Sequence, residues 1–234
     1  MNVKKKVSIT TAAALLFFIT LLAAAVSRHL LIRDIFQPLR QFCVVLDAGH
    51  GGDDPGKVSA SGVLEKDINL AITLKCKSVL EQNGIRVILT RDRDQSIEDP
   101  DADGKKAGDL KKRRQIIRDQ KPDCAVSIHQ NSYPDASQAG SQVFYQAANP
   151  QARELASLIQ KQIRTVTFKE NRREIKANSD YYLLRDNPVP TVITEVCFLS
   201  NPREAEMITE EYVQDKAAFG IAMGIMQYLY ACCP

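Results

Sequence analysis

The chain has 234 residues, of which 44% are hydrophobic and 25% are charged, so it can form one globular domain and is neither disordered nor fibrous. Residues 1–40 contain six basic side chains and one acidic side chain. Because the whole chain has a net charge of +3, residues 41–234 have a net charge of −2. A slightly acidic domain lacks the basic surface that binds phosphate backbones, which excludes nucleic acid as a partner.

The N-terminal region has the pattern of a targeting segment. Three consecutive lysines precede residues 7–26, an uncharged stretch of 20 residues that is long enough to cross a bilayer about 30 Å thick. The small residues Ala23–Ala25 are equally typical of a signal-peptide cleavage site. We therefore predict a signal peptide or membrane anchor at 1–33, a linker at 34–41 and a folded domain at 42–234. Either alternative places the domain outside the cytoplasm, and the membrane is a partner only if the segment is not cleaved.

From residue 42 onward, apolar runs alternate with helical patterns. Strands are predicted at 42–47, 85–90, 123–129, 141–146, 181–184 and 191–198, and helices at 65–82, 107–119, 149–163, a short stretch from Pro202, and 211–230. Strands separated by helices are typical of an α/β fold. We expect a twisted, mostly parallel sheet of about six strands, with helices on both faces because the strands are apolar almost throughout.

The loop after the first predicted strand contains a phosphate-loop pattern, G-x-x-x-x-G-K, at Gly51–Lys57. Its surroundings argue against nucleotide binding. Val58 stands where a hydroxyl would hold magnesium, and Asp53 and Asp54 would repel a phosphate. Pro55 removes one of the backbone N–H donors that form the phosphate cradle. We therefore interpret the match as accidental.

Two of the three histidines lie in the folded domain, and both follow the carboxyl ends of predicted strands. His50 comes after the strand at 42–47, and His129 ends the strand at 123–129. Glu65 begins the next helix and can reach back to the same edge of the sheet, where ligands bind in α/β folds. Two histidines and one carboxylate suit zinc and leave a coordination position open. Non-haem iron uses a similar set, but nothing else in the sequence indicates an oxygenase.

Glu195 lies in the apolar strand at 191–198, where an ionised carboxylate is costly unless it is paired or close to a metal. One interpretation is a structural ion pair with a basic residue such as Arg185. The other is a general base at the same sheet edge, which accepts a proton from the water that attacks the substrate.

The remaining basic runs and the cysteines are predicted to be structural. Lys111–Arg114 and Arg172–Arg173 are expected on solvated surfaces. The six cysteines include no C-x-x-C pair, and Cys43, Cys124 and Cys197 are expected to be buried thiols. Their spacing does not identify a disulfide.

Several blocks of sequence carry a family resemblance. From residue 43 to residue 230 the order and spacing of LDAGHGGDDPG, GVLEKDINL, TRDRD, LKKRRQII, VSIHQNS, GSQVFY and TEVCFLSNPREAE resemble the zinc-dependent N-acetylmuramoyl-L-alanine amidases of the AmiC/CwlV type. Within that family the chain is most similar to the short enzymes that act on spore cortex in sporulation and germination.

The resemblance implies a zinc ion held by His50, Glu65 and His129, with Glu195 as the catalytic residue. It also implies a twisted six-stranded sheet flanked by helices. Division amidases of the family carry a blocking helix after the second histidine motif, whereas here only ten residues, Asn131–Gly140, are available. An unblocked site is therefore expected, with any protein activator unknown.

The implied reaction is hydrolysis of the amide between N-acetylmuramic acid and L-alanine in peptidoglycan. Two alternatives remain open at this point: a zinc peptidase that cuts stem peptides, and a wall-binding module without activity. A buried base such as Glu195 favours an enzyme, because binding alone has no use for one.

Overall fold

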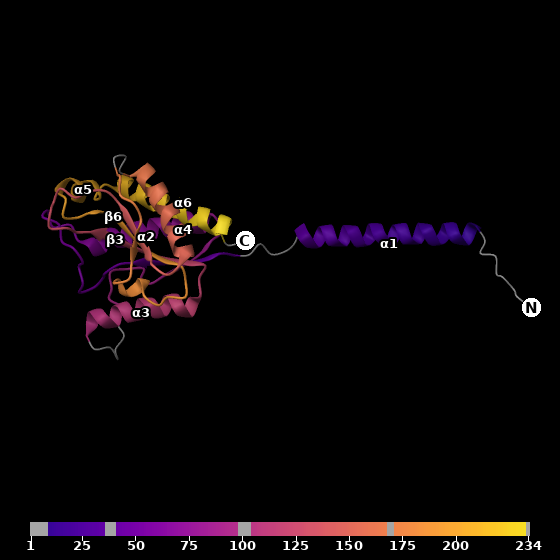
Figure 1. The fold of residues 1–234 in the computed structure, drawn as a ribbon, viewed down its shortest axis with the longest axis horizontal. Coiled ribbons are helices and arrows are strands. Elements are labelled where there is room, and N and C mark those ends of the chain that lie inside the picture. Colours follow the sequence, from indigo (N-terminus) through magenta and orange to yellow (C-terminus); the bar gives the residue numbers. More distant parts are fainter. Residues whose placement is uncertain (1–8, 36–40, 98–103, 168–170, 233–234) are drawn as a thin grey trace, which may run out of the picture. The chain divides into compact units, whose positions relative to one another are not determined.

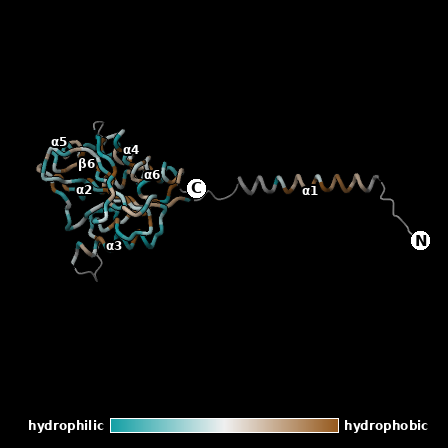
Figure 2. Tube along the Cα trace, in the orientation of Figure 1, coloured by the Kyte–Doolittle hydropathy of each residue, from teal (hydrophilic) through white to brown (hydrophobic). Residues whose placement is uncertain are grey.

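The computed structural model describes residues 9–35, 41–97, 104–167 and 171–232. The chain divides into two units, Met1–Arg40 and Gln41–Pro234. The first unit contains helix α1 (Ile9–Ile35), and hydrophobic residues occupy the middle of this helix (Figure 2). Within the described part of the chain, no helix is both long and apolar enough to cross a membrane. The predicted linker at 34–41 lies largely outside the described residues, and the targeting segment at 1–33 stays a prediction.

The second unit is built on one six-stranded sheet with the strand order β2-β1-β3-β6-β4-β5. The strands are β1 (Cys43–Ala48), β2 (Arg86–Leu89), β3 (Cys124–Asn131), β4 (Gln142–Gln146), β5 (Lys176–Asn178) and β6 (Thr191–Phe198). All neighbouring strands are parallel except β4 and β6, which pair antiparallel. The α/β fold with a mostly parallel sheet is therefore confirmed.

Helices cover both faces of this sheet (Figure 1). One face carries α2 (Glu65–Gln82), α4 (Pro150–Val166) and α6 (Glu211–Cys232), while α3 (Lys105–Gln120) lies on the other. The short helix α5 (Pro202–Met207) follows β6. Strand β1 shows how the alternation of side chains builds two cores: Val44 and Leu46 belong to the large core, and Val45 belongs to a smaller core with Ile117 of α3.

The predicted elements agree with the structure except near residue 180. The helix at 65–82 and the strand at 191–198 have the predicted bounds, and the others differ by a few residues at their ends. The strand predicted at 181–184 is wrong, because Tyr182–Leu184 form a 3₁₀ helix, η1. Leu183 and Leu184 are both buried, at 3% and 2% exposure, in two different clusters. A strand would send consecutive side chains to opposite faces, whereas a helical turn buries both here. Strand β5 was not predicted.

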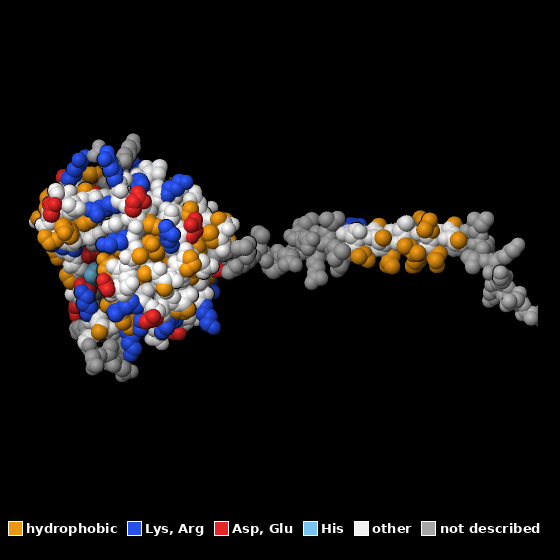
Figure 3. Space-filling view, in the orientation of Figure 1, with side chains coloured by type: hydrophobic (Ala, Val, Ile, Leu, Met, Phe, Trp, Pro, Cys, Tyr) orange, Lys and Arg blue, Asp and Glu red, His pale blue; other side chains and the backbone are white. Residues whose placement is uncertain are grey.

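Charged side chains of both signs lie on the surface of the second unit. Basic and acidic side chains are interspersed over the face visible in Figure 3, and no large patch of one sign is seen there.

Helices α4 and α6 pack closely because α6 has a glycine at their contact. A Cβ atom at Gly224 would lie 2.5 Å from the Cα atom of Ile159. Gly224→Ala should therefore push the two helices apart and lower the free energy of unfolding by ~1–3 kcal/mol, the usual effect of overpacking. Lys216→Ala, at an exposed position of α6, is the control and should leave the denaturation midpoint almost unchanged. Equal stability of Gly224→Ala and the parent protein would contradict this packing.

Candidate active site

A tight turn after β1 brings His50 to the carboxyl edge of the sheet. His50 adopts a left-handed backbone conformation, with φ of 63°. Gly49 precedes it, and a Cβ atom there would lie 2.2 Å from Cε1 of His129. Only glycine leaves room for the His129 ring at this position. The two imidazoles consequently stand edge to face, with ring centroids 5.1 Å apart.

Glu65, the first residue of α2, joins the two imidazoles. Its Oε1 atom lies 3.2 Å from Nε2 of His50 and 3.1 Å from Nδ1 of His129. Burial alone would raise the pKa of Glu65, but the hydrogen bonds from His129 and His50 outweigh burial and lower it well below its usual range. Glu65 is thus held as a carboxylate. The ligand atoms of the three residues all lie within 4.8 Å of one another, which brings the three predicted ligands together.

The surroundings of this cluster suit a metal site. Asp54 Oδ2 lies 2.8 Å from Nδ1 of His50 and accepts a hydrogen bond from it, which turns Nε2 toward Glu65. Partners of this kind fix the orientation of metal-binding histidines. The other Glu65 oxygen, Oε2, accepts a hydrogen bond of 2.8 Å from the backbone N–H of Lys57. The loop that resembles a phosphate cradle therefore supports two members of the cluster, and two imidazoles with one carboxylate are a donor set that zinc prefers.

Glu195 lies beside the cluster on the same face of the sheet. It is the register partner of His129 across the β3–β6 pair. Its side chain is 7% exposed, and its Oε2 atom has no hydrogen-bond partner among the described residues. Burial raises the pKa of Glu195, the charge of Glu65 raises it further, and His129 and His50 offset part of the effect, which leaves it at about 7. A carboxyl group with this pKa can exchange a proton near neutral pH.

The alternative partner of Glu195 lies elsewhere. The guanidinium of Arg185 stands over the ring of Tyr182, 5.6 Å from its centroid. In the described part of the chain, no ion pair joins Arg185 to Glu195. A structural salt bridge therefore does not explain the buried carboxyl group.

Two buried arginines hold the turn that carries His50, and sequence analysis missed both. Arg113 donates hydrogen bonds of 2.7 Å to the carbonyl oxygens of Ala48 and His50. Arg91 donates to the carbonyl oxygens of Ala48, at 2.9 Å, and Gly49, at 3.0 Å. The predicted solvated surface at Lys111–Arg114 is therefore wrong for Arg113, which is 1% exposed. Its position four residues before the buried Ile117 on one helix could have revealed this.

The positive charge of Arg113 is balanced by Asp47 of β1. The Nη1 atom of Arg113 lies 2.5 Å from Oδ1 of Asp47. Burial alone would raise the pKa of Asp47, but Arg113 and the hydrogen bonds from Ser127 and Thr90 lower it to about 2. This pair is buried beneath the turn and keeps both of its members charged.

The cysteines are structural, as far as the structure describes them. Among the described residues, Cys43, Cys76, Cys124, Cys197 and Cys232 are not joined in disulfides. Cys124 and Cys197 are buried as predicted, whereas Cys43 is half-buried. Burial raises the pKa of the Cys197 thiol well above its ordinary value, which makes it unreactive.

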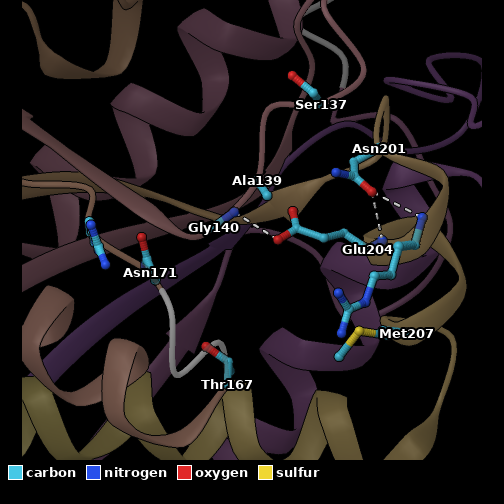
Figure 4. A pocket seen from close by; sticks show the side chains of 10 residues that line it. Ser137, Ala139, Gly140, Thr167, Asn171, Asn201, Glu204 and Met207 are labelled. Carbon is cyan, nitrogen blue, oxygen red and sulfur yellow. Dashed lines mark hydrogen bonds between the residues drawn. The ribbon is translucent and has the colours of Figure 1, made fainter.

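The region around the cluster is open. The segment between β3 and β4, residues 132–141, consists of turns and irregular backbone. Together with residues 57–60 and Ser200 it lines a hollow. A further hollow lies between this segment and α5 (Figure 4), where Glu204 accepts hydrogen bonds of 2.7 Å from the backbone N–H groups of Gly140 and Phe198. Glu204 thus fastens the segment to the end of β6.

Comparison with known proteins gives consistent matches. The sequence profile described as N-acetylmuramoyl-L-alanine amidase matches residues 44–227. The germination-specific N-acetylmuramoyl-L-alanine amidase of Bacillus subtilis (strain 168) is 34% identical over 194 residues, which are 82% of this chain and 81% of that protein. The CwlD amidase of Clostridioides difficile, solved in complex with the GerS lipoprotein, is 40% identical with a TM-score of 0.78 and covers 81% of this chain and 99% of that chain. The catalytic domain of CwlV from Bacillus (Paenibacillus) polymyxa var. colistinus is 33% identical with a TM-score of 0.72, covering 81% and 99%.

The Asp47–Arg113 pair predicts a pH-dependent stability. The pKa of Asp47 is about 2 in the folded protein and 3.8 in its unperturbed state. Its stabilising contribution is therefore complete above pH 3.8 and is lost as the pH falls toward 2, and it amounts to about 2 kcal/mol. Asp47→Asn should be less stable than the parent protein by about this amount at pH 7, because Arg113 then loses one of its two carboxylate partners and keeps only Asp109.

Urea denaturation of both proteins between pH 2 and pH 7 measures this difference. The difference between the two stabilities should shrink as the pH falls from 4 to 2, because the parent carboxylate becomes protonated as the pH approaches its pKa in the folded protein. Asp119→Asn, an exposed carboxylate on α3, is the control and should change stability little at any pH. A difference between Asp47→Asn and the parent that is constant over the whole range would contradict the assignment.

Proposed function

This chain belongs to the N-acetylmuramoyl-L-alanine amidase family, and from that premise we propose that it is a zinc enzyme acting on spore-cortex peptidoglycan, with His50, Glu65 and His129 as ligands. It hydrolyses the amide bond between N-acetylmuramic acid and L-alanine, and because peptidoglycan lies outside the membrane, it acts there. The observation that supports the zinc assignment most strongly is the gathering of three ligand atoms within 4.8 Å beside the buried carboxyl group of Glu195.

The ion would supply Lewis acidity: when bound, zinc polarises the scissile carbonyl and lowers the pKa of water in the site. The residues of this chain are suited to hold it. Glu65 is kept ionised by its neighbours, and Asp54 fixes the ring of His50. Gly49 leaves the space that the His129 ring occupies.

Glu195 would move the protons of the reaction. As a base it takes a proton from the attacking water, and as an acid it returns that proton to the nitrogen of the departing L-alanine. Its raised pKa, about 7, lets it serve in both directions near neutral pH. A nearby cation would favour the charged form and so shift this group toward the base that the first step requires.

The place of action follows from the relatives and from the N-terminal segment. One relative is a germination-specific amidase, which supports the spore cortex as the substrate. We propose that residues 1–33 direct the catalytic unit across the membrane, either as a cleaved signal or as an anchor. The Clostridioides difficile relative was solved with a lipoprotein, and on that ground an extracytoplasmic protein partner is proposed here as well.

Product analysis on purified cortex peptidoglycan tests the reaction. The amidase should release new amino termini that are all L-alanine, without new reducing sugar ends. A stem-peptide peptidase would expose other amino termini, and a wall-binding module would release none. Either of those two results would overturn the proposed function.

Substitution of the ligands should remove zinc and activity together. His50→Ala, Glu65→Ala and His129→Ala each delete one of three protein ligands, so each purified protein should contain far less than one zinc ion per chain. Asp54→Asn should bind zinc ~10–100-fold more weakly, the usual effect of losing a partner of a metal-binding histidine. Atomic absorption and a competition assay with a chelator measure both effects. A full complement of zinc in His129→Ala would disprove the ligand assignment.

Removal of the base should separate catalysis from zinc binding. Glu195→Gln has nearly the same shape, so the protein should fold and bind zinc, while turnover falls by ~10²-fold or more because the amide cannot accept a proton. Glu206→Gln, an exposed carboxylate on α5, is the matched control and should keep full activity. Zinc content, melting temperature and the appearance of L-alanine amino termini are measured on the same preparations. A Glu195→Gln protein with parental turnover would exclude Glu195 from the mechanism.

A further inference from the structure

Tyr181 stands at the start of η1 in a fixed position. Its backbone N–H donates a hydrogen bond of 2.8 Å to Oδ1 of Asn178, the last residue of β5. Its carbonyl oxygen accepts a hydrogen bond of 2.9 Å from the N–H of Leu184, which is itself buried. The backbone is thus held on both sides, so the direction of the Tyr181 side chain is set by the fold.

The ring of Tyr181 belongs to the sheet face that carries Glu195. It packs edge to face on Phe144, with centroids 5.4 Å apart. Phe144 of β4 is the register partner of Ile193, and Ile193 precedes Glu195 by two positions on β6, which places both on one face. Tyr181 therefore forms a wall of the site on the side of the catalytic carboxyl group.

The hydroxyl of Tyr181 is free to meet a ligand. The residue is 36% exposed, and among the described residues nothing accepts or donates a hydrogen bond to its hydroxyl. Partial burial raises the pKa of Tyr181, and the charges of Glu195 and Glu65 raise it further. The phenol consequently remains a neutral donor at physiological pH, close to both carboxylates.

The chemistry of this wall suits a sugar better than a peptide. A half-exposed aromatic ring with a free hydroxyl offers an apolar surface and a polar tip, which matches the C–H face and the hydroxyl groups of a pyranose.

On these grounds, and resting on the amidase function proposed above, we propose that Tyr181 binds the muramic acid side of the substrate. Its ring packs on the sugar, and its hydroxyl donates a hydrogen bond to it. Tyr181 then determines the specificity for substrates that carry the glycan over free lactyl-peptides.

The test compares two substrates with the full-length enzyme. One is a disaccharide-peptide from cortex, and the other is the same peptide acylated with lactic acid and lacking the sugars. Tyr181→Ala should raise KM for the disaccharide-peptide by about tenfold or more, with a smaller change in kcat. Tyr181→Phe should raise it by about fivefold, the worth of one neutral hydrogen bond. Neither variant should change KM for the lactyl-peptide.

Tyr182→Phe is the matched control, because the centroid of that ring lies 4.1 Å from the guanidinium of Arg114, which covers it. It should leave KM for both substrates unchanged. Equal effects of Tyr181→Phe on both substrates, or an effect on neither, would overturn the proposal.

A binding experiment separates this proposal from the proposed function. Glu195→Gln and the double variant Glu195→Gln/Tyr181→Phe are titrated with the disaccharide-peptide by calorimetry, which requires no turnover. Weaker binding by the double variant supports the contact, and identical binding refutes it, even if the parent enzyme were to expose no L-alanine amino termini. Failure of the parent enzyme to expose such termini would overturn the amidase function alone.

Discussion

The catalytic geometry depends on two buried guanidinium groups that hold a three-residue turn. Arg113 and Arg91 together donate to the carbonyl oxygens of residues 48–50, which point toward the protein interior at the end of β1. Without these donors a buried carbonyl of the turn would be left unsatisfied, at a cost of about 1–3 kcal/mol, except that of Gly49, which also accepts a hydrogen bond of 3.1 Å from Nδ2 of Asn69. With them, His50 is kept in a left-handed conformation that a free chain rarely adopts. Asp47 lowers the free-energy cost of burying these groups, because its carboxylate pairs with the guanidinium of Arg113.

The sheet positions His129 and Glu195, and it places the carboxyl groups of Glu65 and Glu195 in different environments. A β-bulge between His129 and Asn131 interrupts the β3–β6 ladder, and the N–H of Gln130 donates instead to Oε1 of Glu65, at 3.1 Å. Glu65 is thereby surrounded by donors and stays ionised, as a ligand must. Glu195 lies in the same region without donors and retains a proton more readily. Opposite environments give the two glutamates different roles, which is how one site obtains both a ligand and an acid–base group.

Much of this arrangement could be predicted from the sequence, since its signals are local. The first turn of α2 and the strand of β6 have the predicted bounds, and the topology of an α/β sheet brings His50, Glu65 and His129 to one edge. The hydrogen bonds from Arg91 and Arg113 that hold the turn could not be predicted in the same way. Arg113 lies in a basic run that reads as a surface, and its burial depends on a partner, Asp47, 66 residues away in sequence. Tyr182–Leu184 form a helical turn because Leu183 and Leu184 fill two separate apolar clusters. A short apolar run in the sequence does not show whether it will form a strand or a helical turn.

The central claim is that the turn held by Arg91 and Arg113 places His50 in a zinc site, which Glu65 and His129 complete. X-ray diffraction from crystals of the purified protein, recorded on both sides of the zinc absorption edge, tests it most directly. The account predicts one anomalous peak per chain within bonding distance of these three side chains, about 2.0–2.2 Å from each ligand atom. It also predicts that Arg91 and Arg113 still hold the carbonyl oxygens of the turn. A zinc peak at other residues, or a bound zinc ion with His50 turned away from it, would contradict the account.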